Sequence, residues 1–533
     1  MSALSQTTHF RIYFFGLLVM AVGLPCSNLL MSLSQIIIGI NWIIEGDYRA
    51  KLSRFLANKP AVIFTSIFGL HLLGLLYTAD FNYALADLRN KVPLLVLPFL
   101  IASSSILSKE RIAWVFRIFV IAVVLGTLVC AGELTPFNDW VRALFNYPAR
   151  EIMDARSISH FISHIRFALM ICLSIFWLFY QAAQVHNSAK ISIGYIAVAM
   201  WLITFMFLME SVTGLAIVFI VGFASLLYVA IKQKRKVIKL GSLALLVLIP
   251  TITFSYIGGM VMDFYKVSEN NVAELPKHTA AGNLYFHDID NRQLENGNYV
   301  WRYVCHLEIE PEWNKRSLIP FKRGRDKAGQ FIEYTLFRYM TSRGLYKDTE
   351  GLAQLNDEEI AAIENGVANV RFSDVSNIES RIYGIIWQID DYNHRGAPGG
   401  HSLSQRWEFW KTGLNVLKKN PLLGVGTGDV YNNMLAQYEA DASLLVPAYR
   451  KHPHNQYLSI ALAFGLIGLL VFLWGLTYPV ILKRRKLDYI AIVFIAVVLI
   501  SMITEDTLET QAGVSFVVFF YSLLLFSTGN ELE

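Results

Sequence analysis

The feature that most constrains this chain is a series of long apolar runs that contain very few charged residues. Hydrophobic residues make up 54% of the 533 residues, and charged residues only 16%. A helix of about 20 apolar residues is long enough to cross the hydrocarbon core of a bilayer. Within lipid the backbone must satisfy its own hydrogen bonds, and a helix does so. We therefore predict an all-α polytopic membrane protein.

The apolar runs predict about twelve transmembrane helices. The first begins near Phe10 behind little positive charge, and a second run follows it almost at once. We therefore interpret the first run as a retained span and not as a cleaved signal peptide. The predicted spans lie near residues 10–25, 28–44, 60–77, 92–107, 112–132, 161–181, 191–209, 211–230, 238–257, 457–482, 488–504 and 512–528.

Basic residues predict the orientation of these spans. Lysine and arginine cluster after the second, fourth, eighth and tenth runs. Cytoplasmic loops carry an excess of these residues, so this side is predicted to be the cytoplasm, together with both termini. The connections after odd-numbered spans then face outward. The net charge of +5 is explained by this loop bias, and no nucleic-acid partner is expected.

The polar and apolar stretches predict three regions. Residues 1–257 hold spans one to nine, and residues 457–533 hold spans ten to twelve. Residues 258–456 form a large outer loop, which is too polar and too long to lie in lipid. Within this loop, helices are predicted at 330–343 and 357–365, and a glycine-rich hinge is predicted at 393–400.

Cysteine and histidine spacing favours a protein without a metal site or a disulfide framework. The four cysteines are scattered, and no CxxC pair occurs. His452 and His454, with His394 and His401 upstream, match no familiar zinc spacing, and no carboxylate completes a ligand set.

The segment from residue 404 to 468 carries the most informative polar pattern. An amphipathic helix is predicted to open at Arg406 and to stop before Pro421, because a residue that precedes proline disfavours the helical conformation. The glycine-rich run that follows is interpreted as a tight turn, since it lacks the Gly-Lys-Ser/Thr ending of a phosphate-binding loop. A histidine cluster then precedes an apolar run. The predicted helix face comprises Arg406, Trp410, Gly413, Leu414 and Leu417. The turn spans residues 424–428, and the histidine cluster spans residues 452–456.

Three residues are candidates for chemistry on a phosphate-containing substrate. Arg166, near the outer start of the sixth span, and Arg406 carry guanidinium groups, which hold phosphate oxygens in a planar, always charged fork. His454 titrates near neutral pH and suits a general base or a group that orients an acceptor hydroxyl. The alternatives are arginines that snorkel or form ion pairs, and a histidine that caps a helix or packs.

Two further groups of charges lie in predicted outer connections. Arg89 and Lys91 could attract an anionic headgroup, although pairing with Asp80 or Asp87 is equally well supported. An acidic turn comprises Glu505, Asp506 and Glu509. It could balance the arginines or bind an acceptor, but most such turns are solvated, and a solvated turn is the favoured interpretation.

The pattern resembles the signature region of bacterial O-antigen ligases and their relatives. The superfamily also holds O-antigen polymerases and protein O-oligosaccharyltransferases. A large periplasmic loop between spans nine and ten, within a layout of twelve spans, is similar too. The resemblance implies a GT-C-like glycosyltransferase of the bacterial inner membrane whose active site faces the periplasm. The residues that carry the likeness are Arg406, Trp410, Pro421, Gly424, Gly426, His454, Asn455, Gly465 and Gly468, with Arg166 upstream.

The resemblance also implies a reaction. A glycan would move from undecaprenyl diphosphate to an acceptor such as lipid A–core or a protein, without a metal or cofactor. Arg166 and Arg406 would bind the diphosphate and stabilise its charge. His454 would activate the acceptor hydroxyl, with inversion at the anomeric carbon. The residues expected to bind substrate beside them are Arg89, Lys91, His164, Trp410, Asn455 and Gln456.

Other functions remain open at this point. A polymerase or a protein O-oligosaccharyltransferase would use the same donor. A transporter of lipid-linked glycans would have broken helices near the midplane and charges deep in several spans, whereas most of these spans are uncharged inside. Residues 282–391 match no motif of the ligases, so they leave the acceptor undetermined.

Overall fold

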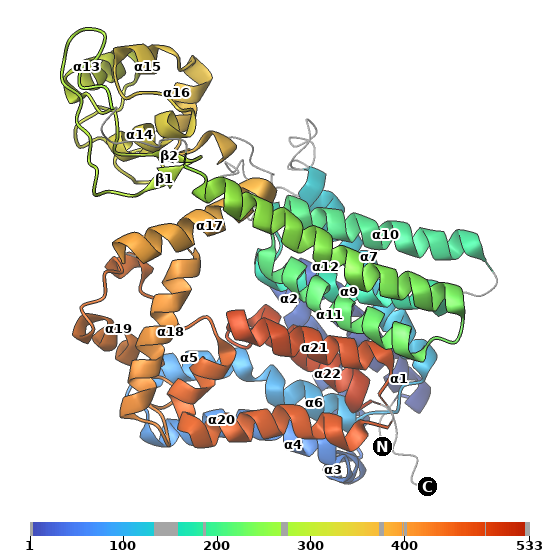
Figure 1. The fold of residues 1–533 in the computed structure, drawn as a ribbon. Coiled ribbons are helices and arrows are strands. Elements are labelled where there is room, and N and C mark those ends of the chain that lie inside the picture. The colour runs from blue at the N-terminus through green and yellow to red at the C-terminus, as the bar shows by residue number, and fades with distance from the viewer. Residues whose placement is uncertain are drawn as a thin grey trace. The chain divides into compact units, whose positions relative to one another are not determined.

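The computed structural model describes residues 4–132, 158–184, 188–267, 275–372, 378–396, 398, 402–485 and 487–527. The chain forms two compact units, one of Met1–Ser225 with Gln405–Glu533 and one of Leu226–Ser404 (Figure 1). Most of the connection predicted between the fifth and sixth spans (132–160), His401 and part of the predicted hinge at 393–400 lie outside the described residues.

The first unit is built mainly from helices. Side-chain caps explain where several of them begin: Asn455, Asp488 and Thr510 each accept a hydrogen bond from a backbone N–H in the first turn of α20, α21 and α22. The helices that lie wholly or partly in this unit are α1 (Gln6–Cys26), α2 (Asn28–Glu45), α3 (Tyr48–Ala57), α4 (Lys59–Leu73), η1 (Gly74–Tyr77), α5 (Phe81–Lys91), α6 (Pro93–Ser103), α7 (Lys109–Gly132), α9 (His164–Gln184), α10 (Ala189–Leu208), α11 (Val212–Lys232), α18 (Ser402–Lys419), α19 (Val430–Ala440), η5 (Pro447–Tyr449), α20 (Gln456–Lys483), α21 (Tyr489–Thr504) and α22 (Gln511–Leu525).

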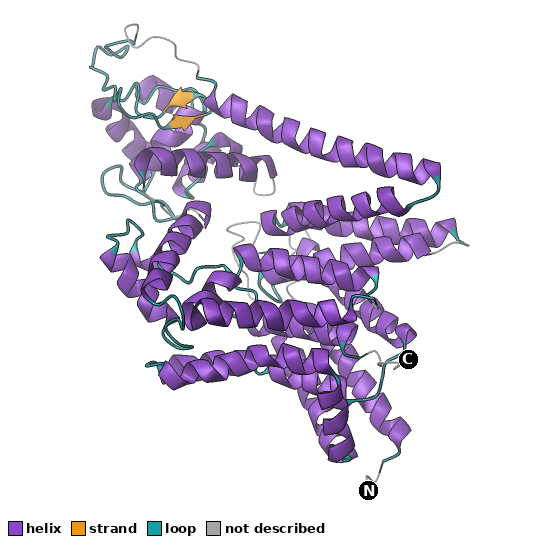
Figure 2. Ribbon diagram, turned by 60° about the horizontal axis from the view of Figure 1, so that its bottom comes forward, coloured by secondary structure: helices purple, strands orange, loops and turns teal. Residues whose placement is uncertain are grey.

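The helices confirm the prediction of an all-α polytopic membrane protein. Within the described residues, nine helices are long and apolar enough to cross a membrane. Each of the twelve predicted spans coincides with a helix, but α6, α21 and α22 have only 11, 16 and 15 residues. Figure 2 shows the described chain as helices and loops, with one small pair of strands in the second unit.

One apolar core holds the first unit together. Helix α20 packs against α4, α22 packs against α6, and α9 packs against both α10 and α21. Helix α9 is enclosed by these neighbours, and its buried residues run from Arg166 to Leu178 without a break. Because α9 is enclosed, a charge at its start faces protein and not lipid.

Helix α20 is interrupted at Gly465. This residue has φ 67°, a left-handed conformation that glycine adopts without steric cost. The backbone groups released by the break are bonded by the turn after α18: Leu466 N–H donates to the Pro421 carbonyl at 2.8 Å, and Val425 N–H donates to the Leu462 carbonyl at 2.9 Å. The predicted run at 457–482 is therefore helical, but it contains a break that its hydropathy does not indicate.

Connections that the charge pattern predicts on one membrane side lie together. Asn58 Nδ2 donates to the Phe526 carbonyl at 3.1 Å, and Leu107 N–H donates to the Ser527 carbonyl at 3.1 Å. These contacts join the exits of the second, fourth and twelfth predicted spans. Among predicted outer connections, Lys91 Nζ lies 2.8 Å from Glu509 Oε2.

The second unit contains one apolar helix and a small polar subdomain. The end of α12 packs on α17 and β1 around Phe264, Tyr383 and Trp387, while a separate core surrounds Trp313 and Met340. The helices predicted at 330–343 and 357–365 are present as α14 and α16. The elements are α12 (Lys236–Tyr265), β1 (Leu294–Glu295), β2 (Asn298–Tyr299), α13 (His306–Arg316), α14 (Ile332–Ser342), α15 (Thr349–Ala353), α16 (Asp357–Glu364), η4 (Val370–Phe372) and α17 (Ile378–Arg395), and β1 pairs antiparallel with β2.

Candidate functional site

The connection between α21 and α22 forms one wall of the candidate site. Glu505 is 2% exposed and Asp506 is 4% exposed, and Glu509 is partly buried. The interpretation of this segment as a solvated turn is therefore wrong. Its carboxylates turn inward because arginine, lysine and serine side chains from other helices hold them there, and a buried charge requires such partners.

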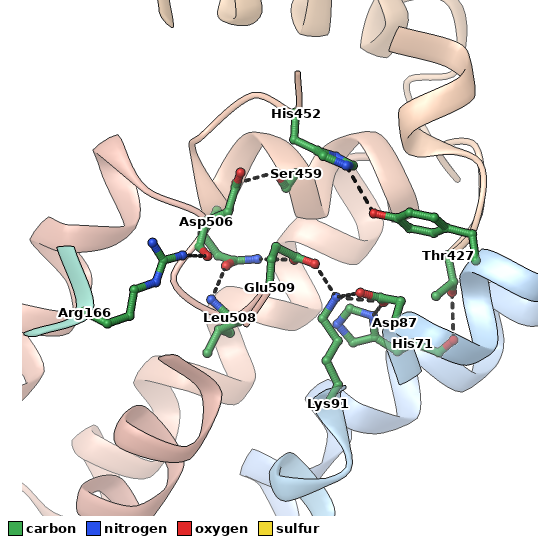
Figure 3. Close-up of polar contacts among 12 residues, drawn as sticks. His71, Asp87, Lys91, Arg166, Thr427, His452, Ser459, Asp506, Leu508 and Glu509 are labelled. Carbon is green, nitrogen blue, oxygen red and sulfur yellow. Dashed lines mark hydrogen bonds and ion pairs between the residues drawn. The ribbon is translucent and has the colours of Figure 1, made fainter. Parts of the chain in front are cut away.

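Both candidate arginines meet at this wall. Arg406 Nη2 lies 2.5 Å from Glu505 Oε1, and Arg166 Nη1 lies 3.6 Å from Glu505 Oε2. Arg166 Nη2 also donates to the Asp506 carbonyl at 2.8 Å, a contact drawn in Figure 3. Burial raises the pKa of Glu505, and the attraction of the two guanidinium groups opposes this effect only in part.

Helix α18 delivers Arg406 to the site. The helix starts at Ser402, four residues before the predicted start, and it ends at Lys419 as Pro421 predicts. Gly413 faces Leu458 of α20, so the close packing of these two helices needs a small residue at this position. Leu414, which the sequence places on the same helix face as Arg406, is 50% exposed.

His454 lies next to the carboxylate wall. Its Nδ1 is 3.6 Å from Asp506 Oδ2, and its ring lies against Phe409. The residue has φ 49°, a conformation uncommon for residues other than glycine. Burial lowers the pKa of His454 to about 4, with a further contribution from Arg406. The imidazole is therefore neutral at physiological pH, but it is a weaker base than the near-neutral titration expected from the sequence.

Lys91 forms a second ion-pair cluster beside this wall. Its Nζ contacts Asp87 Oδ1 at 2.6 Å and Glu509 Oε2 at 2.8 Å, as Figure 3 shows. Burial raises the pKa of Asp87 to about 7. Burial also disfavours the charge on Glu509, but the attraction of Lys91 outweighs it, so the pKa of Glu509 is lowered. His71 Nδ1 approaches Asp87 Oδ2 at 3.7 Å.

Aromatic side chains cover the cluster on one side. Tyr83 Oη lies 3.1 Å from His452 Nε2, and the ring of Tyr431 stacks on His452 with 5.0 Å between ring centroids. Helix α5, which carries Tyr83, is fixed to the turn before α19, because Asp429 accepts from the backbone N–H groups of Ala79 and Asp80.

A cavity of about 410 Å³ lies between these groups. That volume falls in the usual range for ligand sites. The acidic connection contributes carboxylates to this site, and α5 contributes Tyr83, Asp87 and Asn90. Its lining residues are Tyr83, Ala86, Asp87, Asn90, Ile165, Arg166, His452, His454, Glu505, Asp506, Glu509 and Thr510.

The residues predicted for the site have different positions relative to this cavity. Arg166 and His454 line it. Arg406 does not line it, but its guanidinium group contacts Glu505, which does. Lys91 lines a smaller adjacent cavity of about 30 Å³. Arg89 is exposed on α5, and His164 lies half-buried at the start of α9.

Three of the predicted substrate-binding residues have structural contacts. Trp410 Nε1 donates to the Pro453 carbonyl at 2.9 Å. Asn455 caps α20. Gln456 is fully buried, with its Nε2 3.1 Å from Glu509 Oε1 and its Oε1 accepting from Leu508 N–H. These contacts hold the histidine segment and the acidic connection in place.

Sequence reasoning missed several residues that line the cavity. Tyr83 and Asn90 were not singled out, and Glu505 and Asp506 were interpreted as solvated. A signal was present for the carboxylates, since an acidic connection between two apolar runs lies on the same predicted side as Arg166. Among the described residues, no group of three histidine, cysteine or acidic side chains is arranged to hold a metal ion.

The fold and the site define a class: a multi-pass helical membrane protein with arginine, histidine and carboxylate groups around one cavity at the end of its helices. Residues 365–473 match the sequence profile of a family described as O-antigen ligase, which confirms the resemblance predicted from the sequence. The matched segment includes Arg406 and His454, and Arg166 and Glu505 lie outside it. No curated protein matched the chain.

Proposed function

We propose that this protein transfers a glycan from undecaprenyl diphosphate to a hydroxyl group of lipid A–core at the outer face of the bacterial inner membrane. The observation that carries the proposal is the approach of Arg166 and Arg406 to one point in the cavity wall, with His454 beside it. Two guanidinium groups suit the charge that develops on a departing diphosphate.

The proposed chemistry assigns one role to each group. Arg166 and Arg406 bind the diphosphate and stabilise its charge as the glycosidic bond breaks. His454 lines the cavity, and its Nε2 orients the acceptor hydroxyl and takes its proton as the new glycosidic bond forms, while Asp506 faces Nδ1. Attack from the side opposite the diphosphate inverts the anomeric carbon. We propose that no metal ion takes part.

The carboxylate contacts of the arginines do not close the site. Glu505 contacts both guanidinium groups, but the cavity of about 410 Å³ leaves space beside Arg166. Arg166 Nε is buried and has no hydrogen-bond partner. An unpaired buried donor is costly, and Arg166 itself lines the cavity, so its guanidinium group has donor capacity that its protein partners leave unused.

The break in α20 was a feature expected of a transporter. In transporters such breaks line the substrate cavity, whereas the turn at 421–426 fills the break at Gly465 with backbone hydrogen bonds. The charged residues of the site also gather at one end of the helices. Both observations favour an enzyme.

We further propose the arrangement in which this enzyme works. Twelve spans with a GT-C-like arrangement would place residues 1–257 and 457–533 in the inner membrane and residues 258–456 in the periplasm. The contact of Lys91 with Glu509 supports the prediction that these two connections lie on the same side of the membrane.

The test is transfer by purified full-length protein from a defined undecaprenyl diphosphate-linked glycan to lipid A–core. Arg166→Ala, Arg406→Ala and His454→Ala should each lower the turnover rate by about 100-fold or more, because each removes a group that acts in the transition state. Arg450→Ala is the matched control: this arginine contacts Glu439 and the Leu445 carbonyl and does not line the cavity.

A deletion strain separates the ligase from its relatives. Loss of long-chain lipopolysaccharide with accumulation of lipid-linked polymer would support the ligase. Chains of single units would indicate a polymerase, and unglycosylated periplasmic proteins would indicate an oligosaccharyltransferase. Normal transfer by the His454→Ala variant would remove this residue from the chemistry.

A further inference from the structure

The two arginines of the site share one carboxylate. Glu505 lies 2.5 Å from Arg406 and 3.6 Å from Arg166 and is 2% exposed. If the proposed function is correct, a diphosphate binds the same two guanidinium groups. The carboxylate and the diphosphate then bring negative charge to the same two cations, so donor binding is favoured when Glu505 is neutralised or moved.

A count of charges shows why this matters. The walls of the site contain three cations, Arg166, Arg406 and Lys91, and four carboxylates, Asp87, Glu505, Asp506 and Glu509. With all of them ionised, the carboxylates exceed the cations by one. A diester of diphosphate would add two negative charges. Buried charges without partners are costly, so binding in this state would be opposed.

Within the described structure, Glu505 cannot move away from the arginines to pair with another cation. Its neighbours along the connection are Asp506 and Glu509, and Glu509 already holds Lys91. The other titratable groups that face this region from the packed elements are His71, Tyr83, Asp87, Lys91, His452 and His454. The cation among these six, Lys91, is held between two carboxylates.

Arg166 provides a second observation. The residue is 9% exposed, lines the cavity and keeps its Nε without a hydrogen-bond partner. Glu505 contacts it only at 3.6 Å, which is longer than a hydrogen bond. Arg166 is thus only partly satisfied by its protein partners, and its guanidinium group lines the cavity in which the diphosphate is proposed to bind.

We propose that Glu505 is a positioning residue that holds both arginines in place in the empty site and releases them to the diphosphate by taking up a proton. The proton comes from solvent as the donor binds. Donor affinity is therefore linked to pH, and acidification favours binding. This inference rests on the proposed function, because it requires a diphosphate at the two arginines.

Electrostatics supports this role for Glu505. Burial already raises the pKa of this carboxyl group in the empty site. An anion that draws away its guanidinium partners would raise the pKa further, since nearby negative charge favours the protonated form. Asp506 is the main competitor for the proton, because burial and the charge of Glu509 raise its pKa to about 7.

The test is calorimetric titration of the full-length protein in detergent with a short dialkyl diphosphate, whose charges do not titrate near neutral pH. Titrations in buffers with different ionisation heats give the number of protons taken up. We expect about one proton for the wild type, with the affinity falling about tenfold for each pH unit above the pKa of the acceptor group.

The variants identify the acceptor group. Glu505→Gln should bind the probe more tightly than the wild type near neutral pH and should take up about one proton fewer. Glu408→Gln is the matched control: this carboxylate is 7% exposed and lies on the same helix as Arg406, where it faces Lys411. It should leave proton uptake and affinity unchanged.

Several results would overturn the proposal. Unchanged proton uptake in Glu505→Gln, or its loss in Asp506→Asn alone, would show that Glu505 is not the acceptor. Weaker binding by Glu505→Gln at every pH would show a merely structural role. If the wild type does not bind the probe at all, the proposed function itself fails. Binding without proton uptake would reject only the role of Glu505.

Discussion

At the scale of single residues, the site consists of charges whose partners come from distant parts of the chain. Lys91 and Glu509 are 418 positions apart, and Arg166 contacts a carbonyl 340 positions away. A buried ion pair adds little net stability, because desolvation offsets the attraction, but removal of one partner leaves an uncompensated buried charge. The cluster around Lys91 is therefore sensitive to single substitutions.

Replacement of Lys91 by methionine should destabilise the protein strongly. Lys91 is 2% exposed, and its loss would leave Asp87 and Glu509 facing each other without a cation. We expect the free energy of unfolding to fall by about 3–5 kcal/mol, measured by denaturant titration in detergent. The double variant Lys91→Met, Asp87→Asn should recover part of this loss because it removes one unpaired charge.

Lys322→Met provides the control for this prediction. Lys322 also contacts a carboxylate, Glu310, at 2.8 Å, but its side chain is 74% exposed. Exposed pairs contribute about 0–1 kcal/mol. An equal loss in the Lys91 and Lys322 variants would contradict the interpretation of Lys91 as a buried charge that its partners require.

The sequence allowed prediction of the residue types at the site but not of their contacts. Arginine and histidine stand out at the edge of an apolar run because charge is costly there. The pairing of Arg406 with Glu505 depends on how α18 and the acidic connection pack, and no local pattern encodes that packing. For the same reason the burial of Glu505 and Asp506 was missed. The pairing of Lys91 with Asp87 was one of the two alternatives considered for this lysine, the other being an anionic headgroup. The two residues are one helical turn apart, so their contact is local in the sequence.

At the scale of elements, hydropathy located the helices, but packing decided their details. The run at 457–482 is helical as predicted, and its break at Gly465 exists because the turn at 421–426 supplies replacement hydrogen bonds. Leu414 is a similar case: its periodicity groups it with Arg406 on one face of α18, but it does not indicate that the side chain is 50% exposed.

Substitution of Gly465 by alanine should disrupt this junction. A Cβ atom there would lie 2.0 Å from the Leu422 carbonyl oxygen, and φ 67° is strained for alanine. Strained backbone alone costs about 1–3 kcal/mol, and the steric clash adds to this. We expect a lower melting temperature and a lower yield of folded protein, together with reduced transfer, because α20 begins next to His454.

Gly39→Ala is the matched control for the junction. Gly39 lies in α2, and a Cβ atom there would meet nothing within 4 Å. Alanine has the higher helix propensity, so this variant should be as stable as the wild type or slightly more stable. If Gly465→Ala were equally stable, the turn at 421–426 would not constrain α20.

At the scale of the whole molecule, the connections of the first unit fall into two groups. One group joins the exits of the second, fourth and twelfth predicted spans through Asn58, Leu107, Phe526 and Ser527. The other joins α5 and the acidic connection beside the cavity. The basic residues that predict the cytoplasmic side occur with the first group. If that orientation is correct, the cavity opens on the periplasmic side.

Cysteine labelling in a variant without its four native cysteines tests this orientation. Ala436, exposed on α19, belongs to the group near the cavity, and Ser105, exposed between α6 and α7, belongs to the opposite group. In cells with a permeabilised outer membrane, an impermeant maleimide should modify Ala436→Cys but not Ser105→Cys, because the reagent does not cross the inner membrane. After lysis it should modify both. Modification of Ser105→Cys alone before lysis would show that the predicted topology is inverted. The cavity would then face the cytoplasm, where it could not act on a periplasmic acceptor.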